Sequence, residues 1–216
     1  MNIKLLLGIV LAAVLGISIP WVYRYYKVEK INKAFRAETL LYQREIPENS
    51  LNGTITDIGG TAEFEGRYDT EFSPLEIGKT AGYGVDLRTG ANDESFIKIN
   101  FAELADLTVG SNTRLSFANT AADNFLITLN RGGKLNIETI KDNGEVSITA
   151  LHLLSQFTGA TAKIEINDNL ITIELSQGSV KLGYNDLKLV SQTSEISSPK
   201  KIIFNDTKRT IKLKKL

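Results

Sequence analysis

The sequence contains no cysteine, a single histidine and no excess of either charge. Without cysteine the chain has no disulfide, no thiolate nucleophile, no Cys-based zinc site and no N-terminal lipoprotein attachment. With 25 Lys and Arg against 25 Asp and Glu, no general field attracts nucleic acid, which is excluded as a partner. The lone His152 stands among apolar residues, where a structural role suits it better than a catalytic or metal-binding one.

No motif indicates a cofactor, a metal or a catalytic centre. The glycine-rich stretches 58–66 and 131–133 do not lead from a strand into a helix, as a phosphate-binding loop does. Carboxylates at alternate positions of a strand are typical of a solvated face, and a glycosidase pair is defined by its separation in space. We therefore predict a protein that is not an enzyme, with a carbohydrate-active enzyme as the less favoured alternative. The carboxylates considered are Asp57, Glu63, Glu65, Asp69 and Glu71.

An apolar run near the N-terminus, Leu5 to Tyr23, contains no charged residue in 19 positions. This is close to the roughly 20 residues that a helix needs to cross a bilayer core, and aromatic residues follow it as at a membrane interface. No convincing cleavage site ends the run, so an uncleaved anchor is favoured over a removed signal peptide. We divide this region into a tail over 1–4, a transmembrane anchor over 5–26 and a helical stalk over 27–46.

The positive charges around the apolar run conflict with its expected orientation. Lys4 precedes the run and five basic residues follow it between positions 24 and 36, and this count places the C-terminal side in the cytoplasm. A short tail followed at once by an apolar run is instead the usual form of an export signal. We predict a single-pass protein of the bacterial cell membrane with an extracytoplasmic, periplasmic domain.

The sequence pattern changes after residue 50. Short segments alternate apolar and polar residues with a period of two, and turn residues separate them every 8 to 12 positions. This is typical of an all-β sandwich, roll or solenoid, and one helical interruption is expected over 148–157. Gly133 and Gly178 occupy similar places in the segments 126–137 and 170–182, and each is expected in a hairpin turn with positive φ.

A polar corner is predicted at Gly110–Thr113, between two alternating segments. Taken alone, this stretch suggests a phosphate loop or a catalytic serine. Between two strands it is better interpreted as a turn whose Ser, Asn and Thr side chains satisfy the local backbone. Arg114, which follows directly, is a candidate contact residue.

With these segments in place, residues 51–190 resemble a FecR domain. The stretch 51–66 is similar to the opening of the family pattern, and "LTVGSNTRLSF" (107–117), "LNRGGKLNI" (129–137) and "ITIELSQGSVKL" (171–182) are similar to its polar corner, its hairpin and its close. The part in between follows the pattern at Pro74, Leu75, Gly78, Gly84, Leu87, Thr89 and Gly90. The chain departs from the pattern at 102–106 and at Ala160, which separates Gly159 from Thr161.

The resemblance implies a β-rich, solenoid-like or roll-like extracytoplasmic domain without enzymatic activity. The iron-transport regulators of the family join this domain to a cytoplasmic anti-sigma segment, which we expect to be lacking here because four residues precede the apolar run. The predicted function is display of the β-domain for binding or assembly with an envelope protein or a polysaccharide. The alternative is a signal-transducing accessory that acts on a separate partner through its transmembrane helix. The sequence does not predict an oligomeric state.

The C-terminal region, 191–216, is predicted to contain a turn-rich linker followed by two basic strands. The strands, over 201–205 and 210–215, suggest a closing hairpin whose lysines protect an exposed edge. Alternatively, the basic strip contacts anionic lipid or wall polymer. The candidate contact residues, besides Arg114, are Lys200, Lys201, Lys208, Arg209, Lys212, Lys214 and Lys215.

Overall fold

The computed structural model describes residues 46, 47, 49–140 and 145–216. It divides the chain into two compact units, Met1–Ile46 and Pro47–Leu216. The predicted tail, anchor and stalk therefore lie outside the described residues, apart from Ile46. Within the described ranges, no helix is long and apolar enough to cross a membrane.

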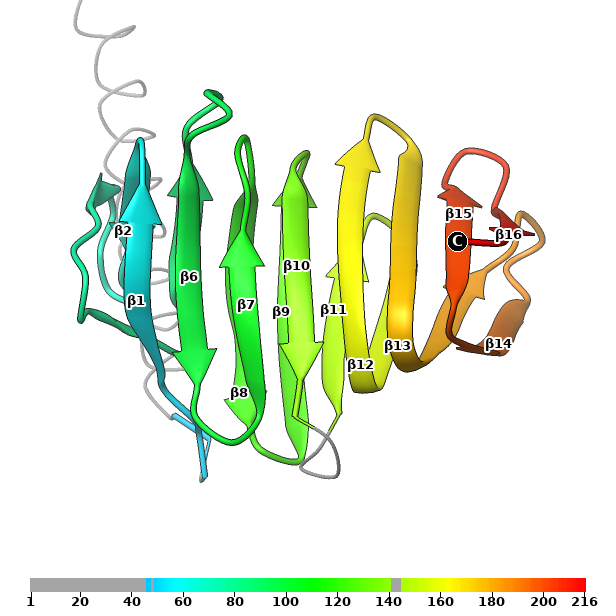
Figure 1. Ribbon diagram of the computed structural model, residues 1–216, viewed down its shortest axis with the longest axis horizontal. Helices are drawn as coiled ribbons and strands as arrows, with labels where there is room; N and C mark the ends of the chain where they lie inside the picture. Colours follow the sequence, from blue (N-terminus) through cyan, green and yellow to red (C-terminus); the bar gives the residue numbers. More distant parts are fainter. Residues whose placement is uncertain (1–45, 48, 141–144) are drawn as a thin grey trace, which may run out of the picture. The chain divides into compact units, whose positions relative to one another are not determined.

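The second unit is an all-β domain, as predicted, and its strands form one 16-stranded sheet (Figure 1). The strands are β1 (Gly53–Gly59), β2 (Ala62–Glu65), β3 (Ser73–Pro74), β4 (Thr80–Ala81), β5 (Asp86–Thr89), β6 (Phe96–Phe101), β7 (Ala105–Val109), β8 (Arg114–Ala121), β9 (Asn124–Arg131), β10 (Lys134–Thr139), β11 (Val146–Ala150), β12 (Leu153–Asn167), β13 (Leu170–Asn185), β14 (Ser191–Ser197), β15 (Lys200–Asn205) and β16 (Thr210–Lys214).

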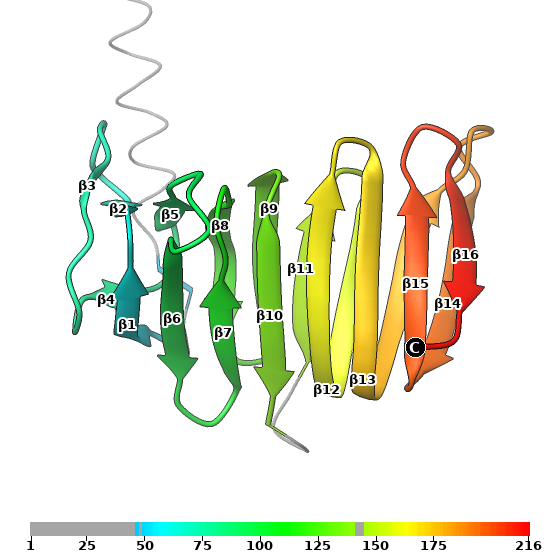
Figure 2. The same ribbon diagram turned by 45° about the horizontal axis from the view of Figure 1, so that its top comes forward.

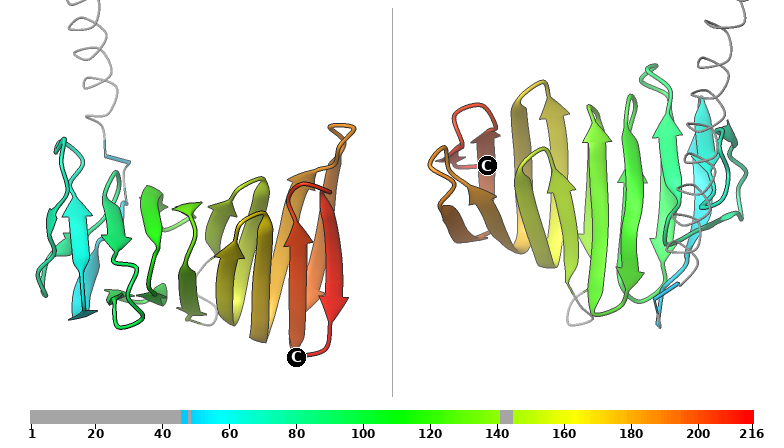
Figure 3. Two further views of the ribbon diagram at one scale, coloured as in Figure 1. Left: turned by 90° about the horizontal axis from the view of Figure 1, so that it is seen from above. Right: turned by 180° about the vertical axis from the view of Figure 1, so that it is seen from behind.

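The sheet folds back on itself into two facing layers, which Figure 2 shows as a nearer and a farther row of strands. Layer A contains β4, β1, β6, β7 and β10 in this order, and layer B contains β3, β2, β5, β8, β9 and β11. The pairs between neighbours are antiparallel, except that β9 and β11 run parallel. In both views of Figure 3 the colours run along the domain, from the cyan first strands at one end to the orange and red last strands at the other.

A long hairpin, β12–β13, belongs to both layers. The first part of β12 pairs with β11 in layer B, and its last part pairs with β10 in layer A. The register between β12 and β13 shifts between Thr158 and Thr161, where the hairpin bends from one layer into the other. The first part of β13 then pairs with β15, which extends layer A through β16, and its last part pairs with β14, which ends layer B.

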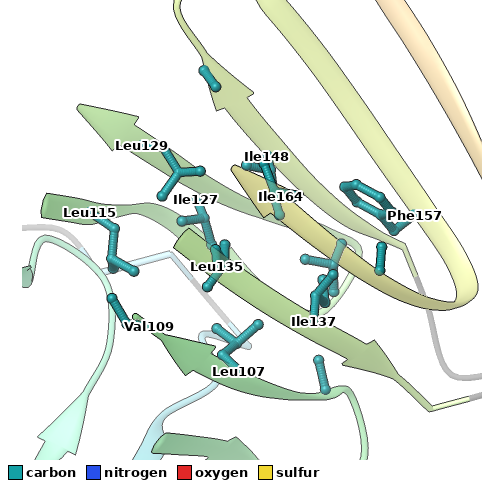
Figure 4. Packing of buried hydrophobic residues seen from close by; sticks show 14 of the residues in the cluster. Leu107, Val109, Leu115, Ile127, Leu129, Leu135, Ile137, Ile148, Phe157 and Ile164 are labelled. Carbon is teal, nitrogen blue, oxygen red and sulfur yellow. The ribbon is translucent and has the colours of Figure 1, made fainter. Parts of the chain in front are cut away.

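The core lies between the layers because each strand turns alternate apolar residues inward. Figure 4 shows side chains of β7 and β10, such as Leu107 and Ile137, facing those of β8 and β9, such as Leu115 and Ile127. All four are at most 1% exposed. The alternation that predicted the strands thus also selects the residues that hold the two layers together.

Thr113 fixes the polar corner, which carries the chain from β7 in layer A to β8 in layer B. Its Oγ1 donates to the Ser111 carbonyl at 3.1 Å and accepts a hydrogen bond from the backbone N–H of Lys134 at 2.9 Å. Its own backbone N–H donates to Thr89 Oγ1 at 3.0 Å. Thr113 is buried, and these bonds join three successive layer crossings.

Replacing Thr113 with valine is expected to lower the free energy of unfolding by about 1–3 kcal/mol, because the hydroxyl of the buried Thr113 is the acceptor of the Lys134 N–H. Urea denaturation followed by circular dichroism measures this change. Ser111→Ala is the control: among the described residues the Ser111 hydroxyl has no hydrogen-bond partner, so we expect a change within about 0.5 kcal/mol. Equal losses for the two variants would contradict this role of the Thr113 hydroxyl.

Two local predictions are wrong. The helix expected over 148–157 is instead the end of β11, a turn at Leu151–His152 and the start of β12. Its apolar strand residues, apart from Leu154, face the core from two paired strands, and Leu151 adopts a φ of 51° that belongs to a tight turn. The linker expected after residue 190 is β14, which pairs with β13 along its whole length.

The two glycines of the repeat have the predicted positive φ, 91° at Gly133 and 75° at Gly178. Neither lies in a hairpin turn. Gly133 precedes β10 where the chain leaves β9, and these strands belong to different layers; Gly178 lies inside β13 at its crossing between layers. The repeat therefore marks two crossings between layers.

Candidate interaction surface

Arg114 lies on the outer face of layer B, within a group of paired charges around Phe72. Its Nη2 is 2.7 Å from Asp86 Oδ2 and 3.8 Å from Glu65 Oε2. Its guanidinium lies 5.1 Å from the centre of the Phe72 ring, which Arg88 covers at 4.0 Å. The charge of Arg114 is therefore compensated within the domain, which weakens its case as a contact residue.

Arg88 is paired in the same way. It forms an ion pair with Glu63, and this hydrogen bond holds the pKa of the Glu63 carboxyl below its ordinary value. Both residues project from paired strands, β5 and β2, on the outer face of the sheet. Such exposed pairs contribute little to stability, so they are best described as a solvated charge ladder.

His152 contacts Asp206 through both its side chain and its backbone. Its Nδ1 lies 3.0 Å from Asp206 Oδ1, and its backbone N–H donates to the same oxygen at 3.2 Å. This contact ties the β11–β12 turn to the β15–β16 turn. Within the described ranges, no group of three or more His, Cys, Asp and Glu could hold a metal ion.

The two ends of the sheet differ in how they close the core. At the end formed by β1 and β2, the inward residues Phe64, Leu75 and Ala81 are buried, and Lys79 Nζ lies 3.9 Å from the centre of the Phe64 ring. The segment between β2 and β4 thus covers this end. A polar or charged cover is what the terminal unit of a stacked β-structure needs in water.

The other end, formed by β14 and β16, is open. Within the described part of the chain, β14 pairs with β13 alone and β16 with β15 alone. Leu213 points to the core side of β16, since it pairs with the buried Ile202, yet its exposure is 53%. Ser194 on β14 is also exposed although it pairs with the buried Leu182. We call this end, with its two free strand edges, the open end.

An apolar loop stands beside the open end, between β13 and β14. Leu187 and Leu189 are 72% and 83% exposed. Asp186 holds the loop in shape: its Oδ1 accepts hydrogen bonds from the backbone N–H of Lys188 at 2.8 Å and of Val190 at 2.9 Å. These bonds, that of Val190 first, hold the pKa of Asp186 below its ordinary value. The anchoring is therefore complete at neutral pH and is lost as the pH falls through the lowered pKa.

The predicted basic residues of the C-terminus gather at the open end, on the hairpin β15–β16. Lys201 is paired with Glu174 on β13, at 2.7 Å, and this hydrogen bond lowers the pKa of Glu174. Lys214 lies directly across from Lys201, and Lys212 lies across from Ile203. Lys200 and Arg209 are half-buried, whereas Lys208, Lys212, Lys214 and Lys215 are exposed and have no ion-pair partner in the described ranges.

The closing hairpin predicted for these residues is confirmed, but their contact with a partner stays a prediction. Arg114 is not among them, since it lies on layer B near β2 and β5.

The sequence-based prediction missed the apolar loop and the free edge of β14. An Asn-Asp turn signal followed by three apolar residues, Leu187, Leu189 and Val190, was the available sign of the loop.

Comparison with known proteins gives a limited result. No family model matches the chain, and no curated protein sequence matches it. Among solved structures, it is similar to two crystal structures, at 1.65 and 2.50 Å resolution, of a protein proposed to be an anti-sigma factor from Parabacteroides distasonis ATCC 8503. The sequence identities are 13% and 12%, and the TM-score is 0.48 for both. Each match covers 58% of this chain and 58% of the other.

Proposed function

We propose that this chain is a non-enzymatic, membrane-anchored envelope protein whose FecR-like β-domain binds a partner protein at the open end. The observation that carries this proposal is the difference between the two ends of the sheet. One end is covered, whereas the other leaves Leu213 and the core side of β14 exposed to solvent. Exposed apolar side chains beside charged ones, here Leu213, Leu187 and Leu189 near the lysines of β16, are typical of a protein interaction site.

The anchor in this proposal rests on the apolar run at 5–23, and the extracytoplasmic location rests on its resemblance to an export signal. The absence of enzymatic activity rests on the pairing of the candidate carboxylates. Glu63 pairs with Arg88, and Asp57 Oδ2 lies 2.9 Å from Lys98 Nζ. Carboxylates that neutralise neighbouring cations on an exposed sheet face are poor candidates for the raised pKa that a general acid requires.

One candidate place for the enzymatic alternative is a hollow of about 370 Å³ on the outer face of layer A. Asp106 and Glu138 line it and lie across from each other on β7 and β10. Asn100 Nδ2 donates a hydrogen bond to Asp106 Oδ1 at 2.7 Å. A third carboxylate in the lining, Glu174, is paired with Lys201, and this hydrogen bond lowers its pKa, whereas the general acid of glycoside hydrolysis needs a raised one.

Photo-crosslinking in intact cells tests the proposal. A benzophenone amino acid at Leu213 or Leu189 of the full chain is expected to give a discrete protein adduct, because both side chains point into the open end or its rim. The same amino acid at Ile77 is the matched control, since Ile77 is 63% exposed but lies at the covered end. Adducts of equal yield and size at all three positions would contradict a specific site.

The identity of the adduct separates the related functions. A crosslinked envelope protein supports the proposal, and an adduct with polysaccharide or lipid would replace it by contact with wall polymer or membrane. The signalling alternative shares the binding step. It differs because it requires this particular transmembrane segment, whereas display requires only an anchor of any sequence.

A further inference from the structure

The free edge of β14 carries a more specific inference, which rests on the proposed function. We propose that an extended segment of the partner protein adds to β14 as a further strand of layer B. A large apolar side chain of this segment reaches over Thr193 into a hollow above Gly183. A basic side chain two residues away lies beside Glu195.

Strand β14 offers a complete edge for this addition. It is seven residues long, and its only partner strand in the described part of the chain is β13. On its other side, alternate backbone N–H and C=O groups have no strand partner, which is the arrangement that extended peptides use when they extend a sheet. Ser191, Thr193 and Ser197 are exposed and short, so none of them obstructs a neighbouring strand.

The other free edge, β16, is protected against the same addition. Lys212 and Lys214 are exposed along it, and lysine on an edge strand discourages further pairing. In contrast, no lysine, arginine or proline occurs between Ser191 and Ser197. The edge of β16 carries lysines and the edge of β14 carries none. We therefore expect a further strand to add to β14 and not to β16.

A hollow lies on the outer face of layer B behind this edge. Gly183 on β13 lies between its strand partners Leu154 and Thr193, and no atom lies within 4 Å of the place where its Cβ would be. A space of about 420 Å³ extends from Gly183 and Thr193 to Leu151 and Leu154, which are 42% and 36% exposed. A phenylalanine-sized side chain opposite Thr193 can reach over this short residue and bury apolar surface in the hollow.

Charge supplies the second feature of the segment. Glu195 is exposed and lies two residues from Thr193, so both side chains are on the same face of β14. A Lys or Arg directly across from Glu195 on the added strand forms a favourable cross-strand pair. The segment is thus expected to carry an apolar and a basic residue two positions apart.

A second copy of this chain fits the edge less well. β14 and β16 end the two layers at the same end of the domain. Two copies paired through β14 would therefore bring their β16 strands close to each other. The unpaired Lys208, Lys212, Lys214 and Lys215 of each copy would then approach those of the other, and this repulsion opposes the contact.

The test uses a defined peptide and the full chain in detergent micelles. The probe is an acetylated and amidated seven-residue peptide with phenylalanine in the centre, lysine two residues to either side and threonine elsewhere. Because it has the same pattern in both directions, it fits β14 in either orientation. Its binding is expected to slow hydrogen exchange at the amides of β14 and to leave those of β16 unchanged.

Two variants and a second peptide test the hollow. Gly183→Val fills the hollow with a residue that suits a strand, and it should weaken binding of the phenylalanine peptide about tenfold. A peptide with alanine in the centre should bind the natural chain and Gly183→Val equally. This result would distinguish side-chain binding in the hollow from backbone pairing along β14. Glu195→Lys should weaken both peptides, and Lys212→Thr, on the other edge, is the control that should leave both affinities unchanged.

The proposal is overturned if the peptide protects β16 rather than β14, or if Gly183→Val binds the phenylalanine peptide as tightly as the natural chain does. Self-association of the natural chain that Gly183→Val abolishes would also overturn it, in favour of a second copy. If the peptide behaves as expected but Leu213 and Leu189 give no specific adduct in cells, the strand site stands and the proposed function fails. If specific adducts form in cells but Gly183→Val leaves peptide binding unchanged, the proposed function stands and the strand site fails.

Discussion

Replacing Gly178 with alanine is expected to lower the free energy of unfolding by about 3 kcal/mol or more. A Cβ at this position would lie 2.2 Å from the Gly159 carbonyl oxygen and 2.7 Å from Ala160 Cα. These are backbone atoms of the neighbouring strand at its own crossing between layers, so no side-chain rotation relieves the contact. The φ of 75° adds about 1–2 kcal/mol of strain for any residue with a Cβ.

Urea denaturation measures this loss, and Gly183→Ala is its matched control on the same strand. Gly183 has open space where its Cβ would be, so alanine should be neutral or should stabilise the strand by up to about 1 kcal/mol. A Gly178→Ala variant as stable as Gly183→Ala would show that β13 does not bend tightly against β12 at this point. It would then contradict a sharp crossing of β13 between the layers at Gly178.

The sequence was sufficient to predict the strands but not their arrangement in layers. Alternation of apolar and polar residues is a local pattern. In segments such as 126–131 and 170–175 it therefore identified which residues are buried without reference to the rest of the chain. Whether a glycine between two such segments makes a hairpin or a crossing depends on which strands pair. That choice is made by contacts distant in sequence, such as Gly178 with Gly159, and the local pattern around the glycine is the same in both cases.

The wrong helix and the wrong linker have local causes. The stretch 148–157 is rich in apolar residues because both of its strands turn residues to the core and one outward residue, Leu154, is apolar as well. The strand β14 contains a single buried apolar residue, Ile196. An edge strand at an open end has little core to face, so its sequence resembles a linker.

The candidate surface was predicted in part. The basic character of the C-terminal hairpin follows from composition alone, and the prediction of an edge strand there is confirmed. The compensation of Arg114 by Asp86 was not predictable, because these residues lie 28 positions apart and meet only when β5 pairs with β8. The open end itself is a property of strand order, and no single segment encodes it.

The second large effect is expected from Phe125→Ala, with a loss of about 3–5 kcal/mol in the free energy of unfolding. Phe125 on β9 is fully buried, and its ring centre lies 4.8 Å from that of Phe101 on β6 in the other layer. Phe117 on β8 also contacts Phe101, with ring centres 5.3 Å apart. Truncation at Phe125 therefore leaves a cavity between the layers and removes an edge-to-face contact that joins them.

Phe125→Leu is the control, because it keeps most of the apolar volume and loses the ring contact; we expect it to cost clearly less than the alanine variant. Urea denaturation of both variants also tests whether the layers unfold together. A lower midpoint with an unchanged slope indicates that the whole domain unfolds as one unit around this cluster. A shallower slope for Phe125→Ala would indicate that the layers separate in steps, with the open end of the sheet as the part farthest from the aromatic contacts. In that case the edge strand β14 would respond to a partner independently of the covered end, and the peptide probe would still bind the destabilised variant.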